Sequence, residues 1–395
     1  MKIYEYQAKE LLSRYHIPVP NGIMVDSAID AGTVTTTIGE QVVIKAQIYS
    51  GGRAKGGGIR FAKSSKEAVR VADDMLGTTL VTKQTGPKGQ RVERVLVEEA
   101  IEIEKEFYLC MVVDRNSANV VIFASNDGGV DVEETAEKLI KISIDPRVGL
   151  QTFQARQIAL AFQLKESNCK HCIQIVQALY DFFMDYDVAI IEINPLILTK
   201  ENCLLVIDAK ISFDDNALFR HPELIELKGT NQEMLNEIEA AKHQVSYVKL
   251  NGNIGCLVNG AGLALATMDI IKLHGSMPSN FLDIGGDASI ERVENALKIL
   301  LADPDVKSIL VNIFGGIVRC DHVAIGMIEA AKRVKIHVPI VIRLAGVHCE
   351  IAEELLAKSS TNFIVAKCLR DAAMKAIATS RGDQVFVDRP KPACP

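Results

Sequence analysis

Two apolar runs separated by the polar residues Lys200-Glu201-Asn202 constrain the fold of this chain more than any other feature. They lie within residues 188–210, VAIIEINPLILTKENCLLVIDAK. Apolar, β-rich runs joined by a short polar loop predict a β-hairpin. A three-residue loop would place Asn194 directly opposite Asp208, with their Cβ atoms roughly 5 Å apart. The hairpin would therefore fix which polar side chains share a face.

Three polar side chains interrupt the strands of this hairpin: Glu192, Asn194 and Asp208. Side chains alternate along a strand, so Glu192 and Asn194 point the same way. Oxygens of Asn194 and Asp208 would suit Mg²⁺, which takes one or two protein ligands and leaves the rest to water and phosphate. A plain hairpin whose polar residues face water is the alternative on these residues alone. Pro195 cannot donate to a ladder, so we expect an edge or a bulge there.

Composition narrows the class of protein. A chain of 395 residues predicts two or three domains, and a net charge of −6 argues against nucleic acid as the main partner. The sequence shows neither a signal-peptide pattern nor an apolar run that spans a membrane, so we expect a cytoplasmic protein with no membrane partner. The nine scattered cysteines favour reduced thiols.

A glycine-rich segment follows an expected strand at residues 41–48, which contains Lys45. Residues 50–58 read SGGRAKGGG, and their backbone N–H groups, with Arg53 nearby, would suit an anion. A flexible hairpin tip is the alternative. Further on, residues 94–114 predict two strands around an acidic connection containing Glu98, Glu102 and Glu106. Those carboxylates could take ribose hydroxyls or a cation, although a solvated turn is the simpler interpretation.

Helical composition dominates residues 152–185, and its Cys169-Lys170-His171-Cys172 lacks a second ligand pair, so we interpret it as incidental. Residues 214–245 are polar and helical in composition and are interpreted as a connector. From residue 248, short apolar runs alternate with helical segments, which predicts a doubly wound parallel sheet. Ligands bind such sheets beyond the carboxyl ends of the strands. Residues 259–262 and 315–318 lie at those ends, with glycines next to helix starts.

Specific stretches together resemble the β subunits of succinyl-CoA synthetase (succinate–CoA ligase, ADP-forming) along nearly the whole chain. They include EYQAKELL, KAQIYSGGRAKGGG, IEINPL, IDAK, GNIGCLVNGAGLALATMD and LVNIFGGIVRCD. The resemblance implies an α/β protein with an N-terminal ATP-grasp unit and a flavodoxin-like CoA-ligase domain. We assign these to residues 1–240 and 241–385, and expect residues 386–395 to be a disordered tail.

The resemblance also implies a reversible reaction of ATP, succinate and CoA to ADP, phosphate and succinyl-CoA. A partner α subunit would carry a phosphohistidine and the CoA site, while this chain would bind ATP or ADP, succinate and one Mg²⁺. Pro20 matches the members that prefer ATP. Asn194 and Asp208 would hold the metal, and Glu192 would support the phosphohistidine in a catalytic role.

The remaining implied site residues fall into two groups. Those expected to bind the nucleotide are Lys45, Gly52, Arg53, Ala54, Glu98, Ile101 and Glu106. Those expected to bind the succinate carboxylates, or to orient the partner's site, are Asn259, Gly316, Ile317 and Val318.

Two departures from the family pattern keep alternatives open. Ala54 stands where the family has glycine. If that position needs a positive φ, alanine would destabilise the backbone conformation there by about 1 kcal/mol. Ala345 replaces a carboxylate, which leaves room for malate. The alternatives are a malate–CoA or citrate–CoA ligase β subunit, and a nucleotide-binding regulatory subunit without catalysis. Intact Lys45 and Asp208 argue against the latter.

Overall fold

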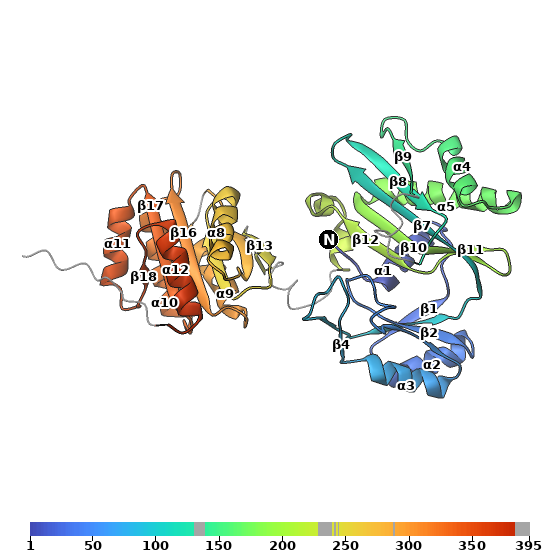
Figure 1. Ribbon diagram of the computed structural model, residues 1–395, viewed down its shortest axis with the longest axis horizontal. Coiled ribbons are helices and arrows are strands. Elements are labelled where there is room, and N and C mark those ends of the chain that lie inside the picture. The colour runs from blue at the N-terminus through green and yellow to red at the C-terminus, as the bar shows by residue number, and fades with distance from the viewer. Residues whose placement is uncertain (130–138, 228–238, 241, 244, 287–288, 384–395) are drawn as a thin grey trace, which may run out of the picture. The chain divides into compact units, whose positions relative to one another are not determined.

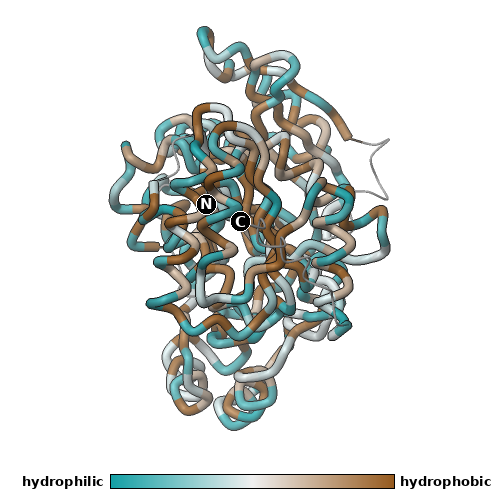
Figure 2. The backbone as a smooth tube through the Cα atoms, turned by 90° about the vertical axis from the view of Figure 1, so that its left-hand side faces the viewer, coloured by the Kyte–Doolittle hydropathy of each residue, from teal (hydrophilic) through white to brown (hydrophobic). Residues whose placement is uncertain are grey.

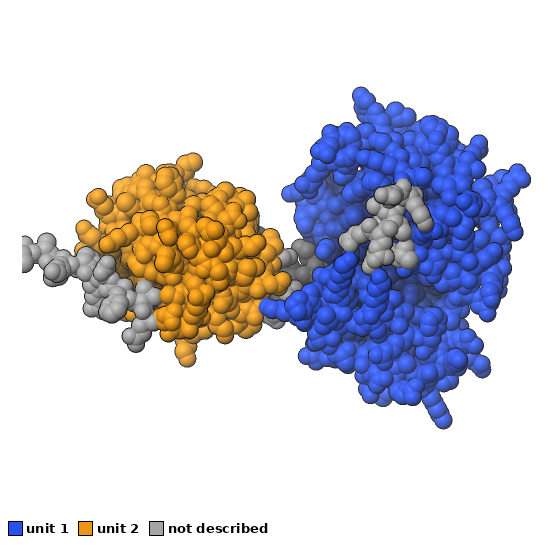
Figure 3. All heavy atoms as spheres, viewed as in Figure 1, with its two compact units in different colours: residues 1–229 blue, residues 230–395 orange. Residues whose placement is uncertain are grey.

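The computed structural model describes residues 1–129, 139–227, 239–240, 242–243, 245–286 and 289–383. The chain divides into two compact units, residues 1–229 and residues 230–395 (Figure 3). The tail at 386–395 and much of the connector, at 228–238, lie outside the described residues. None of the helices in the described ranges is both long and apolar enough to cross a membrane.

A small antiparallel sheet lies at one end of unit 1 (Figure 1). Its strands, in spatial order, are β1 (Gly22–Val25), β6 (Val95–Glu99), β2 (Val42–Ala46) and β3 (Ile59–Ala62). Helices α2 (Ala28–Ile38) and α3 (Ser65–Met75) pack against each other and against this sheet. Strand β2 is buried along its whole length, so its one charged residue, Lys45, is buried too. The short strands β4 (Thr79–Leu80) and β5 (Gln90–Arg91) pair separately.

A six-stranded sheet forms the rest of unit 1. It contains β7 (Ile103–Asp114), β8 (Asn119–Ser125), β9 (Ile140–Ile144), β10 (Val188–Thr199), β11 (Leu204–Val206) and β12 (Ala209–Phe213). Helices α1 (Glu5–Arg14), α4 (Thr152–Ala161) and α5 (Glu166–Asp185) contribute to its core. The helical stretch expected over 152–185 is confirmed, and it is divided into α4 and α5 at Gln163, whose φ is +55°.

The predicted hairpin is confirmed in its position and register. Leu196 pairs with Val206 and Ile193 with Ala209. Thr199 N donates to Cys203 O at 2.9 Å, which closes a loop of three residues. The same register sets Asn194 opposite Asp208, whose backbone O accepts from Asn194 N at 3.3 Å. Strand β10 has neighbours on both sides, so Pro195 marks a bulge, where the pairing with β7 shifts, rather than an edge.

Unit 2 is the predicted doubly wound sheet. Its strand order is β13 (Ser246–Lys249), β15 (Asn280–Asp283), β14 (Ile254–Val258), β16 (Ser308–Gly315), β17 (Ile340–Gly346) and β18 (Ile364–Val365). All pairs are parallel except that of β13, an antiparallel edge strand that the sequence interpretation had left out. The described part of this unit contains the helices α8 (Ala261–Leu273), α9 (Ile290–Ala302), α10 (Cys320–Arg333), α11 (Cys349–Lys358) and α12 (Leu369–Ser380).

Hydrophobic residues gather on both faces of this sheet, as parallel sheets require. One core cluster joins the sheet to α9, α10 and α11, and a second joins it to α12 and to Ile271 of α8. Figure 2 shows hydrophobic and hydrophilic stretches alternating along the backbone. The carboxyl ends of β14, β16 and β17 therefore meet at one edge, where the glycine-containing turns lie.

Candidate functional site

A cluster of buried charges lies where helix α1, the small sheet and the hairpin meet. We call it the charge cluster. Its members come from α1, β2, the glycine-rich segment, β6 and the hairpin: Glu5, Lys9, Lys45, Arg53, Glu98 and Asp208. All except Asp208 are nearly inaccessible to solvent. Three cations face three anions, so the cluster is electrically balanced, which is the condition under which buried charges are tolerated.

Lys45 and Arg53 are held by several acceptors each. The Lys45 Nζ lies 2.6 Å from Glu98 Oε2 and 3.1 Å from Glu5 Oε1, and it donates to Ile207 O at 2.6 Å. Arg53 lies 2.6 Å from Glu5 Oε2 and donates to Asp208 Oδ1 at 2.7 Å. These contacts hold both cations beside the hairpin.

The electrostatics of the charge cluster favour the ionised forms of Glu5 and Lys45. Burial alone would raise the pKa of Glu5, but Arg53, Lys45 and Lys9 outweigh burial and hold that pKa well below its usual range. Burial lowers the pKa of Lys45 less than Glu5 and Glu98 raise it, so its pKa lies above its usual value. The ammonium of Lys45 is therefore charged at neutral pH.

A cavity of about 290 Å³, the Lys45 cavity, opens between the small sheet and the hairpin. Pro20 and Phe61 line this cavity. It is also lined by all the residues that the resemblance implied for nucleotide binding, which are Lys45, Gly52, Arg53, Ala54, Glu98, Ile101 and Glu106. Burial raises the pKa of Glu106. Ala54 lies outside the left-handed region, so the backbone penalty considered for alanine at this position does not arise.

The interpretation of Glu98 as part of a solvated acidic turn was wrong. Glu98 lies within β6 and is 2% exposed, and its two carboxylate oxygens contact Lys9 and Lys45 respectively. Glu102 is the solvent-facing member of the group, in an exposed pair with Lys200 at 2.9 Å. Glu98 therefore lines the Lys45 cavity while both of its carboxylate oxygens are engaged by lysines.

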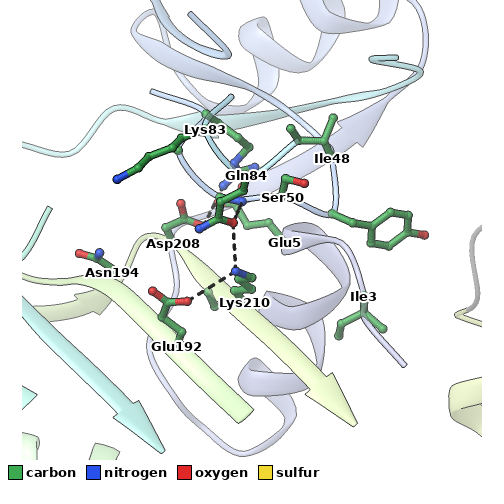
Figure 4. A pocket seen from close by; sticks show the side chains of 15 residues that line it. Ile3, Glu5, Ile48, Ser50, Lys83, Gln84, Glu192, Asn194, Asp208 and Lys210 are labelled. Carbon is green, nitrogen blue, oxygen red and sulfur yellow. Dashed lines mark hydrogen bonds and ion pairs between the residues drawn. The ribbon is translucent and has the colours of Figure 1, made fainter. Parts of the chain in front are cut away.

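A second cavity of about 390 Å³, the Glu192 cavity, is lined by the polar residues of the hairpin (Figure 4). Its walls include Ser50, Lys83, Gln84, Glu192 and Lys210. The two cavities share four lining residues, and these are Gly52, Arg53, Asn194 and Asp208. The two side chains expected to bind a metal thus lie at the junction between the cavities.

Contacts at this junction fit a hard cation. Gly129 N donates to Asn194 Oδ1 at 2.7 Å, which orients the amide oxygen. Gly129 has a φ of +73°, and an added Cβ would come within 1.9 Å of Glu106 Oε2, so only glycine fits there. Within the described ranges, no group of three or more His, Cys, Asp or Glu side chains could hold a metal. A two-oxygen site completed by phosphate and water, as Mg²⁺ accepts, matches Asn194 and Asp208.

A third cavity lies in unit 2 at the carboxyl edge of the sheet. Asn259, Gly316, Ile317 and Val318 line it, as their positions at strand ends predicted. The Asn259 side chain donates to Phe314 O and accepts from Phe314 N, both at 2.8 Å, so it also ties β14 to β16. Ala345 is not among the described residues that line this cavity.

Sequence reasoning missed Lys210, Gln84, Glu5 and Lys9. Lys210 had a usable signal, because the register that pairs Asn194 with Asp208 also pairs Glu192 with Lys210. Gln84 had no such signal in the sequence, because it lies in a loop that is distant from the hairpin along the chain. Glu5 and Lys9 sit four residues apart on α1, a spacing typical of an exposed helical ion pair, yet both are buried.

Comparisons with known proteins identify the domains that contain these cavities. Residues 2–198 match an ATP-grasp domain model and residues 257–377 match a CoA-ligase model. The chain is 50% identical to the β subunit of succinate–CoA ligase (ADP-forming) of Pelodictyon phaeoclathratiforme, over 95% of this chain and 98% of that protein. The same subunit of Syntrophobacter fumaroxidans is 50% identical over 97% of this chain and 100% of its own length. The chain belongs to the family of succinate–CoA ligase β subunits.

Membership of the succinate–CoA ligase β-subunit family confirms the expected order of an ATP-grasp domain and a CoA-ligase domain. It makes the chain one subunit of an ADP-forming ligase, with ATP and ADP as its nucleotides and a partner subunit. A solved structure of ATP citrate lyase from Methanothrix soehngenii is similar in fold, with a TM-score of 0.74 and 18% identity over 95% of this chain and 99% of that one. The alternative of a citrate–CoA or malate–CoA ligase is not favoured by the relatives at about 50% identity.

Proposed function

We propose that this chain is the nucleotide-binding and succinate-binding subunit of a ligase that interconverts ATP, succinate and CoA with ADP, phosphate and succinyl-CoA. A histidine of a partner α subunit, which also holds CoA, would carry the phosphoryl group. The observation that carries the proposal is the junction of the two cavities at Asn194 and Asp208. A nucleotide in the Lys45 cavity would present its γ-phosphate at this junction, and a histidine in the Glu192 cavity would meet it there.

The chemistry asks the protein mainly to position groups and to balance charge. A ring nitrogen of the partner's histidine would form a bond to the γ-phosphorus, and the bond to the β–γ bridging oxygen would break, releasing ADP. Lys45 and Arg53 would offset the charge of the phosphates. Glu192 would accept a hydrogen bond from the other ring nitrogen and so fix the tautomer. Mg²⁺ at Asn194 and Asp208, one per chain, would neutralise charge on the phosphate oxygens.

The cavity in unit 2 would serve the second half of the reaction. Backbone N–H groups around Gly316 and Ile317, with Asn259, would bind the succinate carboxylates or orient the partner's site. The phosphoryl group would pass from the histidine to a carboxylate of succinate, and the thiol of CoA would then displace phosphate. The lining residues support this assignment because the Asn259 amide beside Gly316 and Ile317 is already held in place by Phe314.

The test is co-expression of the chain with its cognate α subunit. The purified complex is assayed for thioester formation with succinate, malate and citrate, each with ATP and with GTP. We expect succinate and ATP to give the highest kcat/KM. Faster turnover of malate would instead support the malate–CoA ligase alternative, and nucleotide binding without any turnover would support a regulatory subunit.

A further inference from the structure

A chain of polar contacts runs along one wall of the Glu192 cavity (Figure 4). Lys210 Nζ lies 3.7 Å from Glu192 Oε2, an ion pair, and donates to Gln84 Oε1 at 3.3 Å. The same Gln84 oxygen accepts from the backbone N–H of Gly51 at 2.8 Å. The contacts thus connect the hairpin to the glycine-rich segment through Gln84, which belongs to neither.

The position of Lys210 follows from the hairpin register. Glu192 and Lys210 are directly paired across β10 and β12, two residues along each strand from Asn194 and Asp208. Side chains two residues apart on a strand share a face, so all four point into the same space. Lys210 is the only cation of this set of four, beside the carboxylates of Glu192 and Asp208.

The Gln84 side chain is exposed, and reciprocal hydrogen bonds fix the turn that carries it. In this turn, Thr82 N donates to Thr85 Oγ1 at 2.8 Å and Thr85 N donates to Thr82 Oγ1 at 3.2 Å. Thr82 is buried. Gly51 leaves room for the contact, because a Cβ at that position would come within 3.0 Å of Gln84 Oε1. The geometry of the turn and the absence of a side chain at Gly51 thus allow Gln84 to contact both Gly51 and Lys210.

We propose that Lys210 is a positioning residue that orients Glu192 toward the incoming histidine, and that Gln84 couples this orientation to the glycine-rich segment. The inference rests on the proposed function, in which Glu192 supports the phosphohistidine. It adds a role for two residues that do not themselves contact the reacting atoms. A lysine side chain is long and loses much rotamer freedom when fixed, so the Gln84 contact keeps its charge beside Glu192 rather than in solvent.

The physical basis is charge balance at half-buried groups. The side chains of Glu192 and Lys210 are 27% and 36% exposed, so their attraction is screened less than that of a surface pair. Without Lys210, the Glu192 carboxylate would face an arriving phosphoryl group with no cation paired to it, because the nearby Arg53 is already held by Asp208. Repulsion would favour rotamers that turn Glu192 away from the histidine.

The first experiment compares Lys210→Met and Lys210→Arg in complex with the cognate α subunit. The rate of transfer of label from γ-labelled ATP to the α-subunit histidine is measured in single turnover, and ADP affinity is measured by calorimetry. We expect Lys210→Met to slow transfer about ten-fold while ADP affinity changes less than about two-fold. Lys210→Arg should restore most of the rate, since a guanidinium can reach both Glu192 and Gln84.

A matched control is Lys200→Met, a lysine on the loop of the same hairpin that is 65% exposed and pairs with Glu102 outside the Glu192 cavity. It should transfer label at the wild-type rate. A wild-type rate in Lys210→Met would overturn the inference. So would failure of the arginine variant to exceed the methionine variant, or an equal loss of transfer and of ADP affinity, because these results indicate a general structural role.

The second experiment tests the coupling. Gln84→Ala should slow label transfer several-fold, and the Lys210→Met/Gln84→Ala double variant should be no more than about two-fold slower than Lys210→Met alone. Multiplicative effects would show that Gln84 and Lys210 act separately and would overturn the coupling. Failure of the wild-type complex to label the histidine at all is a different result, which contradicts the proposed function itself.

Discussion

The guanidinium of Arg53 donates a 2.7 Å hydrogen bond to Asp208 Oδ1, at the point where the Lys45 and Glu192 cavities meet. The carboxylate proposed to bind Mg²⁺ is therefore already paired with a cation. Asp208 has a second oxygen, so it can keep Arg53 while offering Oδ2 to a metal. The arrangement places one fixed cation of the protein beside the proposed cation site, as expected where several phosphate charges gather.

Removal of either proposed metal ligand should stop phosphoryl transfer while the fold persists. Asn194→Ala removes an oxygen ligand of Mg²⁺, and Asp208→Asn removes the negative charge of the other ligand, so we expect a loss of at least about 100-fold in histidine labelling by γ-labelled ATP. Labelling of the α subunit is measured against Mg²⁺ concentration. Glu102→Gln, an exposed carboxylate near the same hairpin, is the control and should label normally. Unchanged labelling in both ligand variants would contradict the assignment.

Glu5 should be far more important for stability than its position on an amphipathic helix indicates. Glu5→Gln removes one of three anions from the charge cluster and leaves Arg53, Lys45 and Lys9 buried with too little negative charge, which should lower the free energy of unfolding by about 3–5 kcal/mol. Glu10→Gln on the same helix removes an exposed pair with Arg14 and should cost less than about 0.5 kcal/mol. Urea unfolding followed by circular dichroism measures both. Equal effects would show that burial of the cluster contributes little.

The lowered pKa of Glu5 predicts a specific dependence of stability on pH. Arg53, Lys45 and Lys9 overcome the effect of burial and hold the folded-state pKa below the ordinary value of 4.5, so near and below that pH the unfolded state binds more protons. The contribution of Glu5 is complete above the unfolded pKa and is lost as the pH falls through the folded pKa. The difference in unfolding free energy between wild type and Glu5→Gln should therefore narrow below about pH 4. A constant difference down to pH 3 would contradict this.

Cysteine reactivity should separate exposed from buried thiols. Cys203 and Cys368 are exposed, whereas burial raises the pKa of Cys110 to about 11 and the pKa values of Cys172 and Cys256 to about 12. In a Cys394→Ser background, alkylation at pH 8 followed by peptide mass spectrometry should modify the exposed pair first, because the thiolate is the nucleophile. The three buried thiols should react only after unfolding. Early modification of Cys172 would show that α5 opens readily.

The hairpin could be predicted from the sequence because its information is local. Two apolar runs, a polar loop and alternation along a strand were sufficient to place Glu192, Asn194 and Asp208 on one face. The same rule would have placed Lys210 there, since it is the direct partner of Glu192. The repeated pattern of unit 2 was predictable for the same reason, although the short antiparallel strand β13 has no signal of its own.

The charge cluster could not be predicted, because it joins residues that are distant in the chain. Glu98 contacts Lys9 across 89 residues, and Arg53 contacts Asp208 across 155. A carboxylate in an acidic stretch favours a solvated turn when only its neighbours in sequence are known. Only the approach of α1 and the hairpin supplies the cations that make burial of Glu98 possible.

The three-residue loop at Lys200–Asn202 has a consequence for how such a chain can evolve. The length of this loop sets the register of pairing across the hairpin. If one residue were inserted or deleted there and the register shifted with it, Asn194 would lie opposite an aliphatic neighbour of Asp208. The Asp208 carboxylate would then point to the opposite face of the sheet. Substitutions at the loop surface change little, whereas a change in its length alters the chemistry several residues away. The length of this solvent-exposed turn thus determines the position of the proposed ligands.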